Sequence, residues 1–200
     1  LPIYYPYNLQ CPKDGNQISL TGCTATATCI IMRYHKWPDA GVGTASAYTT
    51  ASKKIQVPEI MLGTTYRWDK MPLNYTAAST TEQKNAVAQL MAEVGALIRS
   101  DYAAESTGSH LYYVAQVLNP NLKFDKSFLY CESGFYTSSQ WVDMLKDNIA
   151  ETGPVLYAGY SPEGGHAFVV DGYDEEDRLH INWGWGGYGN GYYTYPYFND

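Results

Sequence analysis

The amino-acid sequence predicts an α+β fold, with helices in the first half of the chain and an antiparallel sheet in the last third. Apolar residues recur at helical intervals between residues 82 and 99, whereas short β-rich runs separated by turn residues follow residue 154. The length of 200 residues, 45% of them hydrophobic, suffices for one sizeable core or for two small lobes that share a cleft.

Helices are expected at residues 23–36, 82–99, 109–118 and 139–151. The first begins directly after Gly22 and ends at Trp37; its threonines are poor helix formers, but its alanines suit tight packing. Ser79 and Glu82 have the spacing of a capping box, which marks the start of the second helix. The last helix ends at Gly153, which precedes a proline.

Strands are expected at residues 154–160, 166–173, 178–183 and 191–195, with the acidic residues 174–177 as a hairpin loop. Residues 1–20 are expected to be irregular, and residues 39–75 to form loops with short turns. The sequence contains neither an internal repeat nor a linker. It therefore predicts a single domain over residues 1–200, with a helical lobe over roughly 1–110 and a β-rich lobe over roughly 111–200.

Composition and charge exclude several classes of function. A formal net charge of −7 argues against nucleic acid and anionic membranes as partners, and no apolar run approaches the ~20 residues of a membrane span. The cysteines and histidines lack the clustered spacing of a structural metal site, so no metal is expected. The 20 Tyr and 18 Gly, with only 16% charged residues, favour an extracellular, loop-rich surface.

Cys23 is the candidate nucleophile, because it lies at the expected start of a helix. The backbone N–H groups and the partial positive charge of a helix N-terminus stabilise a thiolate and lower the pKa of the thiol. The alternative is that Cys23 is a small core residue. Core packing is the expectation for Cys29, which lies about 240° further around the same helix.

Three further features complete a possible catalytic arrangement. Gln17 lies six residues before Cys23, where its amide can join the Cys23 backbone N–H in an oxyanion hole. His166 opens an apolar strand behind two glycines, which leave room for a substrate backbone. Asn182 and Trp183 end the next strand, where the amide oxygen can hold the imidazole and the indole can exclude water. Each feature alone has a structural explanation, but their order along the chain is that of papain-like peptidases.

The segments around these residues resemble the streptopain family of bacterial cysteine peptidases. Residues 21–38 resemble its nucleophile helix, residues 164–172 its histidine strand, and residues 180–187 its tryptophan-rich turn. Shorter matches follow in the same order at residues 66–69, 71–72, 90–95 and 101–102. The resemblance therefore covers nearly the whole chain.

This resemblance implies a papain-like fold, with Cys23 in the helical lobe, His166 in the sheet lobe and a cleft between them. It implies a secreted thiol endopeptidase that forms an acyl-enzyme on Cys23, needs no cofactor and is periplasmic only before export. It implies a zymogen whose pro-segment, or a related inhibitor, occupies the cleft. Protein or peptide substrates are expected to contact Gly165, Ser106, Ser109, Ala158 and Tyr160.

Several alternatives remain open at this level. Papain-like enzymes mostly read Asn-Ser-Trp, whereas Trp183 follows Asn182 directly here, so either residue can be the third catalytic member. Cys11 and Cys131 either form a disulfide or remain thiols. The family's glycine-rich loop after this turn is expected to be absent or shortened, because the sequence ends at Asp200.

Two other functions compete with proteolysis. An aromatic-rich surface also suits a non-catalytic domain that binds glycans or proteins. The same cysteine chemistry can also serve an amidase that acts on peptidoglycan. Because the first residue is Leu1 rather than Met, we expect a processed or trimmed product.

Overall fold

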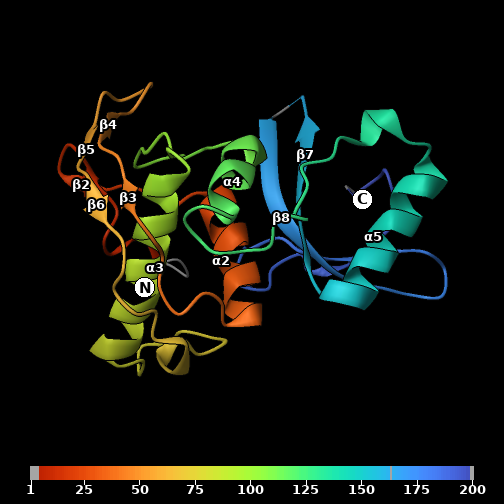
Figure 1. The fold of residues 1–200 in the computed structure, drawn as a ribbon, viewed down its shortest axis with the longest axis horizontal. Coiled ribbons are helices and arrows are strands. Elements are labelled where there is room, and N and C mark those ends of the chain that lie inside the picture. The colour runs from red at the N-terminus through yellow and green to blue at the C-terminus, as the bar shows by residue number, and fades with distance from the viewer. Residues whose placement is uncertain (1–4, 163, 199–200) are drawn as a thin grey trace. The chain divides into compact units, whose positions relative to one another are not determined.

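The structure is a computed structural model that describes residues 5–162 and 164–198 (Figure 1). The chain divides into two compact units, Leu1–Leu129 and Tyr130–Asp200. The first unit extends further than the helical lobe expected from the sequence, and it includes α4 (Leu111–Leu118). The segment after α4 is tied to this unit because the Asn121 side chain donates a hydrogen bond to the Val42 carbonyl (2.9 Å). That the two units are the lobes of one domain remains a prediction. The expectations of a processed start at Leu1 and of a shortened loop near Asp200 lie outside the described residues.

Helices form the centre of the first unit, where Figure 1 shows α2, α3 and α4 close together. Their bounds are α1 (Tyr5–Asn8), α2 (Cys23–His35), α3 (Thr81–Leu97) and α4, which confirms the helices expected at residues 23–36, 82–99 and 109–118. Helix α2 ends at Lys36, which adopts a left-handed conformation (φ 49°) and whose N–H donates to the Arg33 carbonyl. The chain then leaves the helix through Trp37, as the sequence predicts.

The start of α3 lies one residue later than the capping pattern predicts. Thr80 is the N-cap; its hydroxyl accepts the Gln83 N–H (3.2 Å), and the Gln83 side chain accepts the Thr80 N–H (2.8 Å). The Ser79 hydroxyl instead accepts the Thr76 N–H (2.9 Å) in the preceding turn. The capping box is therefore Thr80–Gln83, and the prediction of Ser79 and Glu82 was wrong.

Short paired strands lie in segments that the sequence predicts as loops or irregular chain. The antiparallel pairs are β1 (Lys13–Asp14) with β2 (Gln17–Ile18), β3 (Thr44–Ala45) with β6 (Ile60–Met61), and β4 (Tyr48–Thr49) with β5 (Gln56–Val57). A 3₁₀ turn, η1, follows at Trp68–Lys70. Strands of two residues are too short to show alternation, which is why the sequence does not reveal them.

A buried carboxyl group lies on the core side of α3. Glu93 is 4% exposed and accepts hydrogen bonds from the Tyr66 hydroxyl (2.8 Å) and the Gln89 amide (3.0 Å). Burial raises the pKa of Glu93, although the Tyr66 and Gln89 hydrogen bonds oppose that shift. The protonated form of Glu93 is therefore favoured more in the folded chain than in the unfolded one.

The second unit is an antiparallel sheet packed on one helix, in the strand order β10-β9-β8-β7. Its elements are η2 (Ser133–Phe135), α5 (Ser138–Thr152), β7 (Val155–Ser161), β8 (Gly164–Tyr173), β9 (Leu179–Asn182) and β10 (Gly191–Tyr193). These bounds confirm the expected helix and all the expected strands. The acidic residues 174–177 do form the loop between β8 and β9, where Asp174 pairs with Arg178 (2.7 Å).

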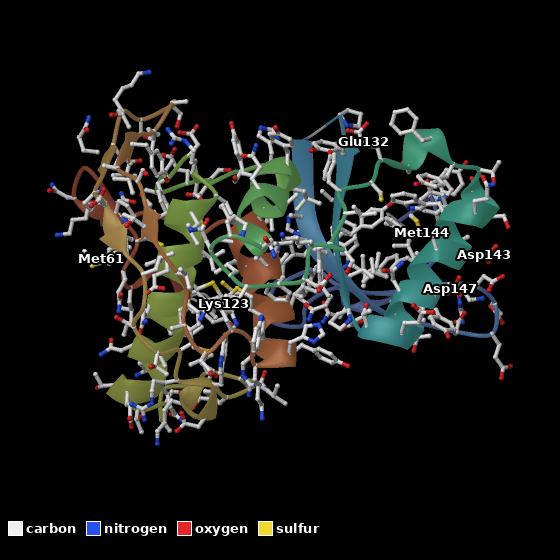
Figure 2. All side chains as sticks on the ribbon, in the orientation of Figure 1. Met61, Lys123, Glu132, Asp143, Met144 and Asp147 are labelled. Atoms are coloured by element: carbon white, nitrogen blue, oxygen red, sulfur yellow. The ribbon has the colours of Figure 1, made fainter. Side chains whose placement is uncertain are left out.

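The core of this unit lies between α5 and the sheet. Trp141 and Leu145 on the helix pack with Phe168, Ile181 and other sheet residues. Figure 2 shows Met144 on the sheet side of α5, and Asp143 and Asp147 on the opposite side. None of the helices in the described residues is long and apolar enough to cross a membrane.

Candidate active site

Cys23 is the first residue of α2, and its side chain is partly exposed. The residue before it, Gly22, has φ 87° and ψ 158°, a conformation that glycine alone adopts readily. A Cβ at Gly22 would lie 2.5 Å from the Thr107 carbonyl oxygen, so the close approach also requires glycine. Because the first N–H groups of a helix have no partner within it, they favour a thiolate at Cys23.

The threonines of α2 explain how a sequence poor in helix formers makes a buried helix. Thr26 and Thr28 donate their hydroxyls to the carbonyls of Gly22 and Thr24, four residues earlier (both 2.8 Å). The Thr24 hydroxyl donates to the Ser109 carbonyl (3.0 Å), which ties the start of α2 to the loop after Thr107. The buried hydroxyls are therefore satisfied, and the helix end that carries Cys23 is held in place.

Two of the other cysteines, Cys11 and Cys29, are buried and are poor candidates for a nucleophile. Burial raises the pKa of Cys11 to about 11, and burial also raises the pKa of Cys29, which lies in the core as expected. Cys131 packs partly buried against the sheet core of the second unit. Cys11 and Cys131 are both thiols in this structure and belong to different units.

His166 lies on β8 opposite Gly159 of β7, and its ring is held by a backbone carbonyl. The His166 Nε2 atom is 2.9 Å from the Trp183 carbonyl oxygen. A carbonyl oxygen only accepts hydrogen bonds, so Nε2 carries the proton and donates it. In the neutral ring the lone pair is therefore on Nδ1, and Nδ1 is the nitrogen that can act as a base.

This arrangement corrects the expectation that the Asn182 amide holds the imidazole. The Asn182 side-chain oxygen instead accepts the Gly184 N–H (3.0 Å), so Asn182 shapes the turn. Trp183 is fixed at both ends, because its N–H donates to the Asn190 side chain and its indole N–H to the Gly189 carbonyl (both 3.0 Å). The chain thus presents the Trp183 carbonyl to His166, a contact that no side-chain pattern reveals.

Aromatic rings surround the imidazole in the second unit. The ring centroids of Phe168 and Trp183 lie 6.0 and 5.9 Å from that of His166, and Trp185 lies at 4.8 Å. The sequence predicts a shielding indole at Trp183, and Trp185 is a second indole beside the imidazole that this prediction does not include. The Trp-Gly-Trp repeat at residues 183–185 is the pattern that could have identified the second indole.

Several known proteins match this chain in sequence and in fold. Residues 3–193 match the Peptidase C10 family. The chain is 35% identical to thiol protease/hemagglutinin PrtT of Porphyromonas gingivalis, over 94% of this chain and 22% of that protein. It is 32% identical to streptopain of Streptococcus pyogenes serotype M1, over 97% of this chain and 52% of that protein. The active wild-type interpain A cysteine protease of Prevotella intermedia has a similar structure, with a TM-score of 0.87, 33% identity, and coverage of 95% of this chain and 80% of that chain.

The chain belongs to the peptidase C10 family. Membership confirms the resemblance to streptopain that the sequence suggested, and it makes this chain a member of a family of cysteine proteases. The mixed α+β architecture matches interpain A of the same family. The chain spans about half the length of streptopain and about a fifth of PrtT.

Two of the predicted site residues of the first unit are connected to the start of α2. Gln17 lies six residues before Cys23 in the sequence, and the Ser109 carbonyl accepts a hydrogen bond from Thr24. Gln17 is exposed on β2, and Ser106 is exposed in the loop that precedes Ser109. The Ser109 hydroxyl donates to the Ile98 carbonyl (2.6 Å), so it serves the fold. The oxyanion role of Gln17 and the substrate contacts of Ser106 and Ser109 remain predictions.

The predicted substrate residues of the second unit lie on β8, which carries His166, and on the neighbouring strand β7. Tyr160 pairs with Gly165, and Ala158 with Ala167, so alternation places these residues on the sheet face opposite His166. The Tyr160 ring lies so close to Gly165 that a Cβ there would meet it at 2.8 Å. Among the described residues, the His, Cys, Asp and Glu side chains form no group of three or more that could hold a metal ion.

Proposed function

We propose that this chain is the catalytic domain of a secreted endopeptidase, with Cys23 as nucleophile and His166 as its acid–base partner. The observation that carries the proposal is the position of Cys23, a partly exposed thiol at the first residue of α2, in a chain that matches peptidase C10 over residues 3–193. The geometry of His166 supports its role as the acid–base partner, because its Nε2 proton is held by the Trp183 carbonyl and Nδ1 can exchange protons.

Acylation uses a pair of ions, the Cys23 thiolate and the His166 imidazolium. The thiolate attacks the carbonyl carbon of the peptide bond, and the carbonyl electrons move onto the oxygen. The Cys23 N–H and the Gln17 amide stabilise that oxyanion. The C–N bond then breaks as Nδ1 of His166 gives its proton to the leaving amine, which leaves a thioester on Cys23.

Deacylation reverses the direction of proton transfer. Neutral His166 takes a proton from a water molecule, whose oxygen attacks the thioester carbonyl. The C–S bond breaks, and the product leaves as a carboxylic acid, which gives its proton to the solvent to become the carboxylate; the thiolate and the imidazolium are restored. The Nε2–H bond to the Trp183 carbonyl persists through both halves, so one ring nitrogen handles both proton transfers.

The remaining parts of the proposal concern lobes and partners. The first unit supplies the nucleophile and the second the imidazole, as two papain-like lobes with protein or peptide substrates in the cleft between them. Tyr160, Ala158, Gly165 and Ser106 contact the substrate. Similarity to a Prevotella intermedia prointerpain A fragment, with a TM-score of 0.85 over 60% of that chain, supports a precursor whose pro-segment occupies this cleft.

Alkylation by iodoacetamide at about pH 6–7, followed by peptide mapping, tests the nucleophile. Cys23 is expected to react at least about tenfold faster than Cys131, which is also partly exposed and serves as the internal reference. Cys23→Ala is expected to abolish cleavage of a quenched peptide library, whereas Cys131→Ala keeps it. Equal reaction rates at Cys23 and Cys131, or full proteolysis by Cys23→Ala, would refute the proposal.

The substrate class is tested with the same wild-type protein. Cleavage of denatured protein identifies an endopeptidase. Release of amino groups from cell walls without cleavage of protein identifies an amidase, and saturable glycan binding without turnover identifies a binding domain. Either of these last two results would overturn the proposed function.

A further inference from the structure

Three consecutive backbone N–H groups fix the path of the chain between β2 and α2. The Ser19 N–H donates to the Pro12 carbonyl (3.0 Å). The Leu20 N–H donates to the Ala103 carbonyl (3.0 Å). Both acceptors belong to the main chain, so no side-chain substitution deletes them. The third N–H, that of Thr21, is held by a side chain.

The acceptor for the Thr21 N–H is Asn8, the last residue of α1. The N–H lies 2.9 Å from Asn8 Oδ1, and because a backbone N–H needs an acceptor, the atom that faces it is the amide oxygen. The Thr21 hydroxyl oxygen lies 2.8 Å from the Tyr7 carbonyl oxygen and 3.0 Å from Asn8 Oδ1. Since both of these oxygens only accept, the Cys11 thiol is the donor in its 3.5 Å contact with the Thr21 hydroxyl. Thr21 is 3% exposed, so Asn8 satisfies a polar group that is largely shut off from water.

The position of Thr21 matters because of the residues on either side of it. Gln17 lies four residues earlier in the sequence, and Cys23 two residues later. Between Thr21 and Cys23, a Cβ at Gly22 would lie 2.5 Å from a backbone carbonyl oxygen, so this tightly packed stretch has no room to absorb a shift. If Asn8 no longer accepted the buried Thr21 N–H, the chain would have to move to satisfy that group. Such a movement would reach the Cys23 N–H two residues further on.

We propose that Asn8 is a positioning residue for the oxyanion hole. It holds the Thr21 N–H and thereby sets the position of the Cys23 N–H relative to the Gln17 amide. The inference rests on the proposed function, in which these two donors stabilise the same oxyanion. Two donors act together only when each lies about 3 Å from the one oxygen, so a small displacement of either weakens the pair.

The test compares Asn8→Ala, which removes the acceptor, with Asn8→Asp, which keeps an oxygen in the same place. The control is Tyr48→Phe, which removes another buried hydrogen bond of the first unit, from the Tyr48 hydroxyl to the Ser100 carbonyl (2.7 Å). Loss of a whole oxyanion donor lowers kcat by about 10²–10³, so a displaced donor in Asn8→Ala is expected to lower kcat on a quenched peptide about tenfold. KM is expected to stay within about twofold, because the oxyanion forms only after the substrate has bound. Asn8→Asp is expected to recover most of kcat, and Tyr48→Phe to keep it.

A double-mutant cycle tests whether Asn8 acts through the oxyanion hole. In a Gln17→Ala background the hole has already lost one donor, so the position of the other matters less to the pair. Adding Asn8→Ala to that background is therefore expected to lower kcat by no more than about threefold.

Two further measurements do not depend on turnover. Iodoacetamide alkylates Cys23 by displacement of iodide, a step without an oxyanion, so its rate is expected to stay within about twofold in Asn8→Ala. The Thr21 amide proton, followed by NMR, is expected to exchange with water faster in Asn8→Ala than in the wild type or in Asn8→Asp. If Asn8→Ala does not fold, Asn8→Ser, whose side chain is too short to reach the Thr21 N–H, replaces it.

The outcomes separate this inference from the proposed function. An unchanged kcat in Asn8→Ala would overturn the role of Asn8, and so would an equal fall of kcat in the wild-type and Gln17→Ala backgrounds. An equal fall of kcat and of the alkylation rate would also overturn it, because that result indicates a displaced thiol rather than a displaced oxyanion donor. In each of these cases the wild type still cleaves peptide, and the proposed function stands. A wild-type protein that cleaves no peptide, or a Gln17→Ala variant with full kcat, refutes the proposed function or its oxyanion hole, and this inference falls with it.

Discussion

The glycine before the nucleophile gives the sharpest prediction for stability. Gly22 has φ 87° and ψ 158°, a region in which a residue with a side chain loses about 1–3 kcal/mol. The added methyl group in Gly22→Ala would also lie 2.5 Å from the Thr107 carbonyl oxygen, a backbone atom that cannot swing away. Such overpacking costs about 1–3 kcal/mol more. The expected loss is therefore about 4 kcal/mol, a large fraction of the ~5–15 kcal/mol that stabilises a typical domain.

Urea unfolding followed by circular dichroism measures this loss. For a chain of this size, about 4 kcal/mol corresponds to a fall in Tm of roughly 8–16 °C. The matched control is Gly15→Ala, because Gly15 also has a positive φ (61°) but a Cβ there meets open space in the described part of the chain. It is expected to lose only about 1 kcal/mol. Equal losses at Gly15 and Gly22 would show that the contact with Thr107 does not constrain the start of α2.

Three further changes test separate parts of the chain. Burial raises the pKa of Glu93, so the stability that this carboxyl group contributes is complete below its pKa in the unfolded chain, near 4.5, and is lost as pH rises through its higher pKa in the folded chain. Glu93→Gln should therefore gain stability relative to wild type between about pH 4 and 7. A difference in the free energy of unfolding in urea that stays the same at every pH would contradict this. Thr24→Val removes the donor to the Ser109 carbonyl, so unfolding should become easier by about 1–2 kcal/mol and KM should rise, whereas unchanged stability would mean that this hydrogen bond contributes nothing. Gly165→Ala pushes against the Tyr160 ring, which is 78% exposed and can move, so we expect a raised KM with less than about 1 kcal/mol lost; an unchanged KM would argue against a substrate contact there.

Most of the secondary structure follows from patterns that act over short distances. The helix that ends at Gly153 and the strands of the last third have the periodicity and the breakers that their structures require. The start of α3 shows where short-range sequence patterns fail to fix a helix boundary. Ser79 and Thr80 both have capping-box partners three residues later, and the choice depends on the preceding turn, which uses the Ser79 hydroxyl for the Thr76 N–H. That competition is not visible in either pattern alone.

The candidate site was predictable where side-chain type carries the chemistry. Cys23 at a helix start and His166 behind two glycines could be found from the sequence, because a nucleophile and a base need those residue types. The partner of the imidazole could not, since any residue supplies a carbonyl and only the path of the chain decides which one is presented. The same reason explains why the sequence leaves Asn182 and Trp183 as alternatives beside the imidazole, whereas the Asn182 side chain accepts a hydrogen bond within the turn.

The contact between His166 and the Trp183 carbonyl has a consequence for how this chain can vary. A main-chain oxygen is present whatever amino acid occupies position 183, so no single substitution deletes the acceptor, and an alanine scan would not detect it. What can be lost is the route of the backbone, which depends on positive φ values at Gly184, Gly187 and Gly189 and on the Asn190 side chain that holds the Trp183 N–H. The orientation of the imidazole therefore depends on the backbone conformation of these glycines. Replacing the 183–184 amide by an ester would weaken this acceptor without altering a side chain, although it would also remove the Gly184 N–H that Asn182 accepts.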